Sequence, residues 1–463
     1  MGCAGDDVVR TPHMDRLAQA GVRFDSCYCP APLCVPSRMS FMSGLYPSRS
    51  RVWSNSCILG SGIPTFAHGL GTAGYETVLA GRMHFVGPDQ RHGFEHRLVG
   101  ELTAVYPGAP LKALPRELWV ATGQSRAAVT TAGPGRTGYQ AYDEAVAEAC
   151  EHFLQSHRAP ERPFCLVAGF VLPHCPFVCR KEDWDYYINR VTLPHIPEGH
   201  FDRLHPAVQL WRSNRGVEDL CEDEILRARA GYYGLVTHLD RQIGRITEAL
   251  NASGLADNTI VIYTSDHGEM AGEHGMWWKS SFYEGSAGIP LIVSRPGQEG
   301  VAAPSGRVVN LVDVGPTVLD MAGADSPEGI DGRSFAALLD GRGNDWLDET
   351  FSEHGPSMGV PACRMIRRGP WKLTHYEGYR PQLFNLEDDP GEWHDLGEDP
   401  AHQEIREQLH TRVLDGWSGR RVTKALERRA REWDLQASWF ARVQPDCREQ
   451  WAAPPGANVF PEE

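Results

Sequence analysis

The chain has 463 residues and a formal net charge of −15, because 60 Asp and Glu residues outnumber 45 Lys and Arg residues. This acidic balance argues against a nucleic-acid-binding protein, which carries a basic surface. The sequence has no apolar run long enough to span a membrane and no export signal at its start. Twelve cysteines over this length do not indicate a disulfide framework. We therefore expect a cytoplasmic protein with reduced thiols and with no nucleic-acid or membrane partner.

Helical and strand patterns alternate along most of the chain, which favours an α/β fold with a largely parallel central sheet flanked by helices. Thr11-Pro12 is typical of a helix N-cap and first helical residue, and Gly21 of a helix end. The expected elements are a helix over 13–20, an extended segment over 22–29, strands over 75–80 and 163–172, a helix over 222–250, strands over 259–264 and 289–294, and a helix over 312–321.

The pattern changes after about residue 345. Residues 365–376 predict short strands with turns, and residues 401–417 and 422–439 predict helices. We therefore expect a larger domain over 1–345 and a smaller C-terminal α+β subdomain over 346–463.

Cys34-Val35-Pro36-Ser37-Arg38 is the segment that says most about chemistry. In one interpretation Cys34 is a buried structural cysteine, since free cysteines are often buried and Pro36 fits the first turn of a helix. In the other, Cys34 is a nucleophile whose thiol pKa is lowered by a helix N-terminus and by Arg38. These five residues alone do not decide between the two.

Asp266 and His267 follow the predicted strand over 259–264, and open α/β sheets bind ligands at such strand ends. A carboxylate beside an imidazole is a candidate metal site, with oxygen favouring Ca²⁺ or Mg²⁺ and imidazole favouring Mn²⁺. The alternative is an Asp that caps the next helix beside a structural His.

Several of these segments together resemble the sulfatase family. The residues that carry the resemblance, in family order, are Thr11–Leu17, the Cys-x-Pro-x-Arg signature Cys34–Arg38, Gly81–Phe85, Leu172–Phe177, Ser265–Glu269, Gly272–Gly275, Trp278–Lys279, and Gln382–Leu386 with Asp389–Glu392. The run Gly81–Phe94 looks most like the branch of choline sulfatases and phosphonate monoester hydrolases.

The resemblance implies an alkaline-phosphatase-like fold and a nucleophile made by oxidising Cys34 to formylglycine, with a formylglycine-generating enzyme as maturation partner. Cys34, Asp266 and His267 would hold one divalent ion (Ca²⁺, Mn²⁺ or Mg²⁺). The remaining catalytic residues would be Arg38, Arg82, His84, His174 and Lys279, of which His174 and Lys279 would also bind substrate. Position 82 departs from the commoner Lys of the family, which changes the geometry of that charge.

The implied reaction is hydrolysis of a small anionic sulfate monoester to an alcohol and sulfate, by a protein that forms homo-oligomers. Other hypotheses are a phosphonate monoester or phosphodiester hydrolase with the same site, an impaired sulfatase-like protein, and a plain cysteine hydrolase. Four aromatic residues lie close to Lys279 in the sequence: Trp277, Trp278, Phe282 and Tyr283. They are either part of the hydrophobic core or a surface that binds a quaternary ammonium such as choline.

One family feature has no counterpart in residues 1–33. Sulfatases carry, ahead of the cysteine, a hydrophobic strand that ends in metal-binding carboxylates, and Asp6-Asp7 follows no such strand. We therefore assign no metal role to Asp6 or Asp7. We expect a gap beside a central strand, with exposed apolar side chains and unpaired backbone groups, and a metal site short of carboxylates.

Overall fold

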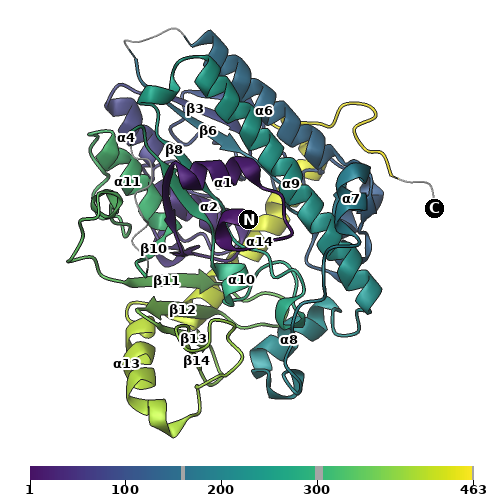
Figure 1. The fold of residues 1–463 in the computed structure, drawn as a ribbon, viewed down its shortest axis with the longest axis vertical. Helices are drawn as coiled ribbons and strands as arrows, with labels where there is room; N and C mark the ends of the chain where they lie inside the picture. The colour runs from purple at the N-terminus through teal and green to yellow at the C-terminus, as the bar shows by residue number, and fades with distance from the viewer. Residues whose placement is uncertain (158–161, 298–305, 461–463) are drawn as a thin grey trace.

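The computed structural model describes residues 1–157, 162–297 and 306–460, and Figure 1 shows their arrangement. The strands are β1 (Gly21–Phe24), β2 (Ser26–Tyr28), β3 (Glu76–Gly81), β4 (His96–Val99), β5 (Gly133–Pro134), β6 (Phe164–Gly169), β7 (Val178–Cys179), β8 (Val261–Thr264), β9 (Leu291–Ser294), β10 (Val308–Asn310), β11 (Glu349–His354), β12 (Cys363–Arg368), β13 (Trp371–Tyr376) and β14 (Gln382–Asn385). The helices are α1 (Pro12–Gln19), α2 (Cys34–Ser43), α3 (Pro47–Ser50), α4 (Phe66–Thr72), α5 (Arg126–Thr130), α6 (Gly138–Ser156), α7 (Lys181–Tyr187), α8 (Pro206–Arg215), α9 (Glu222–Ala252), α10 (Glu284–Ala287), α11 (Val314–Met321), α12 (Ala336–Leu339), α13 (Gln403–Leu414) and α14 (Gly419–Val443).

The α/β fold class is confirmed, and the elements expected from the sequence are present with ends that shift by a few residues. α9 is the longest, because its 31 residues contain no proline that would interrupt it. Thr11 and Pro12 are confirmed as the N-cap and the first residue of α1. The Thr11 side chain makes no capping hydrogen bond, because its hydroxyl donates to Asp15 and accepts from the Gly2 amide.

The central strands form two separate sheets. In one, β3 pairs in parallel with β4 and β6; in the other, β9 pairs antiparallel with β1 and β8. Side chains on β3 alternate between two apolar layers, since Leu79 packs with residues of α2, α4 and α11 while Ala80 packs with residues of α6 and α9. Helices therefore cover both faces, and α6 and α9 lie side by side on one of them (Figure 1).

A gap separates the two sheets. β6 and β8 each pair with one neighbour only, and no strand among the described residues pairs with their second edges. Every residue of β8, and every residue of β6 before Gly169, is only half-buried, although both strands lie in the middle of the fold. Both strands line one cavity of about 1790 Å³, together with apolar side chains of α9 and α11 such as Leu239 and Val318. The structure thus has the gap that the sequence led us to expect.

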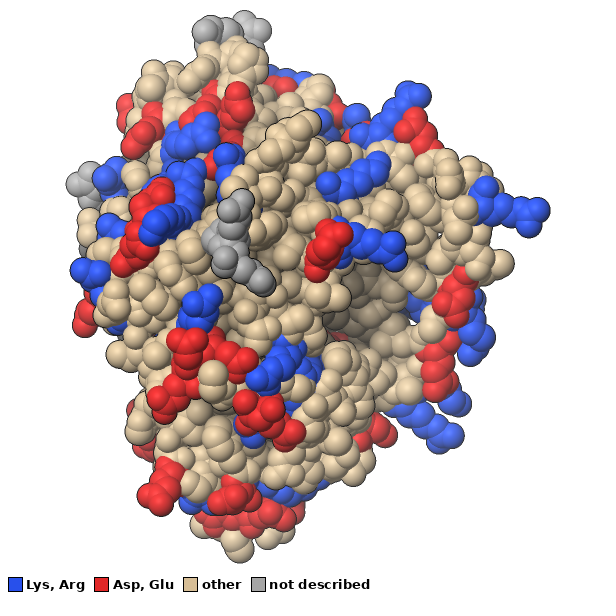
Figure 2. Space-filling view, turned by 90° about the vertical axis from the view of Figure 1, so that its right-hand side faces the viewer, with Lys and Arg blue, Asp and Glu red and all other residues tan. Residues whose placement is uncertain are grey.

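The C-terminal part contains an antiparallel sheet of four strands, β11 to β14, with α13 packed on it (Figure 1). β10 of the larger part packs against β11, so the boundary at 345/346 stays a prediction. No helix in the described ranges is both long and apolar enough to cross a membrane. Acidic and basic side chains are interspersed over the face in Figure 2, which is hollowed near its centre.

Candidate active site

Cys34 is the first residue of α2, and its side chain is almost fully buried, with 1% of the residue exposed. The extended backbone of Leu33 leads into the helix, so the sulfur lies at the positive end of the helix dipole. Lys279 Nζ donates to the sulfur at 3.2 Å, and His267 Nε2 lies 3.4 Å from it. Burial alone would raise the pKa of this thiol, but Lys279, His267 and Arg82 outweigh it and hold the pKa well below its usual range.

Arg38 links α2 to the segment that follows β8. One turn after Cys34, its Nε donates to Asp266 Oδ2 at 2.8 Å and its Nη1 donates to the Arg82 carbonyl at 3.0 Å. The Ser37 hydroxyl donates to the Asp266 backbone carbonyl at 2.5 Å. Burial would raise the pKa of Asp266, yet Arg38 and His267 lower it to about 2, so this carboxylate is ionised.

Among the residues that the structure describes, one group of three side chains could hold a metal ion. The ligand atoms of Cys34, Asp266 and His267 all lie within 4.8 Å of one another. His267 Nδ1 donates to the Gly268 carbonyl at 2.9 Å, so in the neutral ring Nε2 carries the lone pair and faces the other two ligands. A sulfur or oxygen, a carboxylate and an imidazole suit a divalent ion, although three ligands are fewer than the six to eight that Ca²⁺ takes.

Arg82 and His84 follow β3 and approach the nucleophile from another side. Arg82 Nη2 donates to His84 Nδ1 at 3.1 Å, so the neutral ring carries its proton on Nε2. That ring also hydrogen-bonds the Cys34 sulfur. Burial and Arg82 lower the pKa of His84, which keeps the ring neutral near pH 7 and able to donate through Nε2.

His174 has the opposite tautomer. Its Nδ1 donates to the Cys175 carbonyl at 2.8 Å, so Nε2 holds the lone pair and accepts from Lys279 Nζ at 3.3 Å. Burial and Lys279 lower the pKa of His174 to about 4. Lys279 thus contacts both the nucleophile and this histidine.

The structure brings all eight predicted site residues together, from five separate parts of the chain. Two further polar residues line the cavity described above, and the sequence analysis did not identify them as site residues. Asn55 accepts from the Val35 amide at 3.0 Å, and Gln124 donates to the Ser280 hydroxyl at 2.9 Å. Both lie in loops without a residue pattern, so no signal marked them.

The aromatic residues beside Lys279 are mainly core. Trp277, Phe282 and Tyr283 are buried, and of the group only Trp278 lines the cavity. Glu269 accepts the Trp278 and Ala271 amides and shapes the loop that carries Lys279.

Comparison with known proteins identifies the family. The family model described as Sulfatase matches residues 1–324, and one described as N-sulphoglucosamine sulphohydrolase, C-terminal, matches residues 272–417. The choline-sulfatase of Rhizobium meliloti (strain 1021) is 33% identical, over 96% of this chain and 86% of that protein. The arylsulfatase of Clostridium perfringens is 28% identical, over 91% of this chain and 92% of that protein. The structure of a phosphonate monoester hydrolase from Silicibacter pomeroyi superposes with a TM-score of 0.72 at 26% identity, over 89% of this chain and 90% of that one. The chain therefore belongs to the sulfatase family.

Proposed function

We propose that this protein hydrolyses a small organic sulfate monoester to an alcohol and sulfate. The observation that carries the proposal is the group of cationic side chains at one buried nucleophile: Lys279 donates to the Cys34 sulfur, Arg82 helps to lower the pKa of that thiol, and Arg38 pairs with Asp266 in the adjoining metal-ligand group. Such an arrangement stabilises the negative charge of a tetrahedral sulfuryl group as it is transferred.

Cys34 acts in this proposal as formylglycine, whose hydrate carries two hydroxyl groups on one carbon. Once converted, residue 34 would supply one hydroxyl oxygen as the nucleophile that displaces the alcohol from sulfur, and a second hydroxyl whose deprotonation would release the sulfate and restore the aldehyde. The helix N-terminus and Lys279 stabilise the anionic oxygen that attacks, as they stabilise the thiolate in the unconverted chain.

The metal ligands proposed are Asp266, His267 and the side chain of residue 34. A bound divalent ion would lower the pKa of the attacking hydroxyl and offset charge on the sulfuryl oxygens. Arg38 keeps Asp266 ionised and oriented toward this position.

Proton transfer to the leaving alcohol is assigned to the pair of Lys279 and His174. Lys279 Nζ lies within hydrogen-bond distance of both the nucleophile and His174 Nε2, so a proton held between them is close to the bond that breaks. His84 serves instead as a neutral donor, because Arg82 fixes its proton on Nε2.

A phosphonate monoester is the second candidate substrate, because a hydrolase named for that activity superposes over most of the chain. Choline sulfate is a third, supported by the choline-sulfatase relative and by Trp278 at the cavity wall. Homo-oligomer formation and a cytoplasmic location stay predictions.

The test uses the full chain produced together with a formylglycine-generating enzyme, with conversion of Cys34 measured by peptide mass. We expect turnover of para-nitrophenyl sulfate or choline sulfate in Mn²⁺ or Ca²⁺, loss of it in EDTA, and none for Cys34→Ala. The matched control is Cys57→Ala, which replaces a buried cysteine outside the site.

Faster turnover of the corresponding phosphonate ester would favour the second candidate. A fully converted but inactive protein in every metal would favour the impaired protein, and activity that thiol alkylation abolishes but EDTA spares would favour a cysteine hydrolase.

A further inference from the structure

Glu101 is a buried acid that the proposed chemistry does not use. It follows β4, and none of its surface is exposed. Burial would raise its pKa, but Arg97, His84 and Arg82 lower the pKa to about 2, so the side chain is a buried carboxylate. A buried charge of this kind is costly unless every lone pair has a donor.

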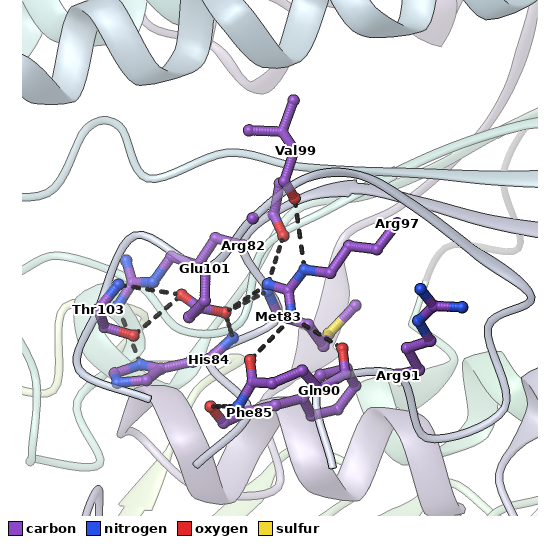
Figure 3. Close-up of polar contacts among 12 residues, drawn as sticks. Arg82, Met83, His84, Phe85, Gln90, Arg91, Arg97, Val99, Glu101 and Thr103 are labelled. Carbon is purple, nitrogen blue, oxygen red and sulfur yellow. Dashed lines mark hydrogen bonds and ion pairs between the residues drawn. The ribbon is translucent and has the colours of Figure 1, made fainter. Parts of the chain in front are cut away.

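The donors come from three parts of the chain (Figure 3). Oε2 accepts the His84 amide at 2.8 Å, the Met83 amide at 3.3 Å and Arg97 Nη2 at 3.1 Å. Oε1 accepts the Thr103 amide at 3.2 Å and its hydroxyl at 2.9 Å. Two of the five donors are therefore backbone amides of the segment that carries Arg82 and His84.

That segment has an unfavourable backbone conformation. His84 has φ of 62°, in the left-handed region that favours glycine, and such a conformation is strained for a residue with a side chain. A left-handed residue of this kind persists only where neighbouring groups hold its backbone. The carboxylate of Glu101 holds it here, because its oxygen accepts a hydrogen bond from the backbone amide of His84.

Arg97 fixes the backbone on the N-terminal side of Arg82. Its Nη2 donates to the Gly81 carbonyl at 3.2 Å as well as to Glu101, and its Nη1 donates to both the carbonyl and the side chain of Gln90. The ion pair therefore holds the backbone before and after Arg82. Figure 3 shows Glu101 between Thr103 and Arg97, with the His84 ring directed away from the pair.

The C-terminal tail fixes the backbone of Glu101 in turn. The Glu101 amide donates to the Glu449 carbonyl at 2.5 Å, and the Trp451 amide donates to the Glu101 carbonyl at 2.8 Å. Trp451 also packs edge-on against Tyr142, with ring centres 5.1 Å apart, and the Tyr142 hydroxyl donates to the Gly100 carbonyl. Glu101 is thus held at both its backbone and its side chain.

We propose that Glu101 is a positioning residue that, with Arg97, holds the left-handed turn at His84 and so directs Arg82 and His84 at the nucleophile. The role rests on the proposed function, since it concerns the same site. Glu101 touches no reacting atom, and it acts through the turn alone.

The first experiment compares Glu101→Gln with wild type in the converted protein. The amide keeps the shape but replaces one acceptor by a donor, which faces an N–H group whichever way the amide is placed. We expect kcat for para-nitrophenyl sulfate to fall about 10- to 100-fold, with a smaller change in KM, because loss of supporting contacts misplaces catalytic groups. Glu95→Gln is the matched control: Glu95 lies six residues earlier, is exposed and pairs with Arg162, and its loss should leave kcat unchanged.

Double-mutant cycles with His84→Ala and with Arg82→Ala separate positioning from general destabilisation. If Glu101 acts through the turn, its substitution should cost at least severalfold less kcat in at least one of these two backgrounds. An undiminished cost in both overturns the proposal. If Glu101→Gln does not fold, Arg97→Lys provides the same comparison with the charge retained.

Hydrogen exchange distinguishes failure of this proposal from failure of the proposed function. Amides of the peptide that covers residues 82–85 should lose protection in Glu101→Gln and keep it in Glu95→Gln, and this holds even for a protein with no sulfatase activity. Unchanged protection of that peptide contradicts the role of Glu101. An inactive wild type with the expected exchange pattern contradicts only the proposed function.

Discussion

At the scale of single residues, the site depends on which ring nitrogen of His84 and of His174 carries the proton. Neutral His84 presents Nε2–H, whereas neutral His174 presents a lone pair at Nε2, and the backbone or side-chain partner at Nδ1 decides each case. The motifs identify both histidines but do not assign these tautomers, because the partners, Arg82 and a carbonyl, act through distances that a sequence does not contain.

Lys279 is the largest single cause that lowers the pKa of the Cys34 thiol. In the unconverted protein with EDTA, Lys279→Met should raise that pKa, since it removes a positive charge 3.2 Å from the sulfur. The thiolate absorbance at 240 nm against pH, with Cys34→Ala subtracted, measures this. Lys181→Met, at an exposed position paired with Asp185, is the control. An unshifted titration in Lys279→Met would show that Lys279 does not contact the thiolate in solution.

Asp143 repeats the arrangement of Glu101 at the other histidine. Buried in α6, its two oxygens accept the Val171 and Leu172 amides at 2.9 and 3.0 Å, just ahead of His174. Burial raises the pKa of Asp143 to about 7, against an ordinary value of 3.8. The folded protein therefore binds this proton more tightly than the unfolded chain does.

The sign of the pH effect follows from linkage. The contribution of Asp143 is fully present below about pH 4 and is lost as the pH rises through about 7, so the free energy of unfolding of wild type should fall with pH, relative to Asp143→Asn, by on the order of a few kcal/mol. Urea unfolding of both proteins between pH 4 and pH 8 checks this. A difference that stays constant over this range would mean that the pKa of Asp143 is the same in the folded protein and in the unfolded chain.

At the scale of elements, the C-terminal tail contributes to a site to which it supplies no side chain. Its Glu449 and Trp451 pair with the backbone of Glu101. The helices before the tail were predicted from their patterns, but the tail pairing was not, because a three-residue contact across the fold leaves no periodic signal.

Removing residues 445–463 should lower kcat while α/β secondary structure is retained, because the tail holds Glu101 but lies outside the two central sheets. We expect about a 10-fold loss, measured with para-nitrophenyl sulfate alongside circular dichroism. Removing only residues 453–463 keeps both hydrogen bonds to Glu101 and is the matched control. Equal losses in the two truncations would place the effect elsewhere in the tail.

At the scale of the whole molecule, the sequence predicts the α/β class and the layers, because these follow from alternating patterns. The grouping of the site residues was predicted from the resemblance to sulfatases, and strand-end reasoning alone pointed only to Asp266 and His267. It does not predict the antiparallel direction of β9 between β1 and β8, because a buried strand has the same composition in either direction. The gap between β6 and β8 was expected only from the resemblance to sulfatases.

The gap predicts uneven protection within the first sheet. Amides of β6 that face the cavity should exchange quickly, whereas amides of β3, which is paired on both edges, should exchange slowly. Hydrogen exchange resolved to single amides measures both strands in one sample, with β3 as the internal reference. Slow exchange along both edges of β6 would mean that another strand occupies the cavity in solution.

The tail contact also sets an order of events during synthesis. Cys34 leaves the ribosome well before Glu449 and Trp451, whose backbone groups bond to that of Glu101. In the finished fold Cys34 is 99% hidden from a modifying enzyme, with 1% exposed. In the proposed function, conversion of Cys34 therefore has to precede complete folding, and a chain that folds before conversion would keep an unmodified, buried cysteine.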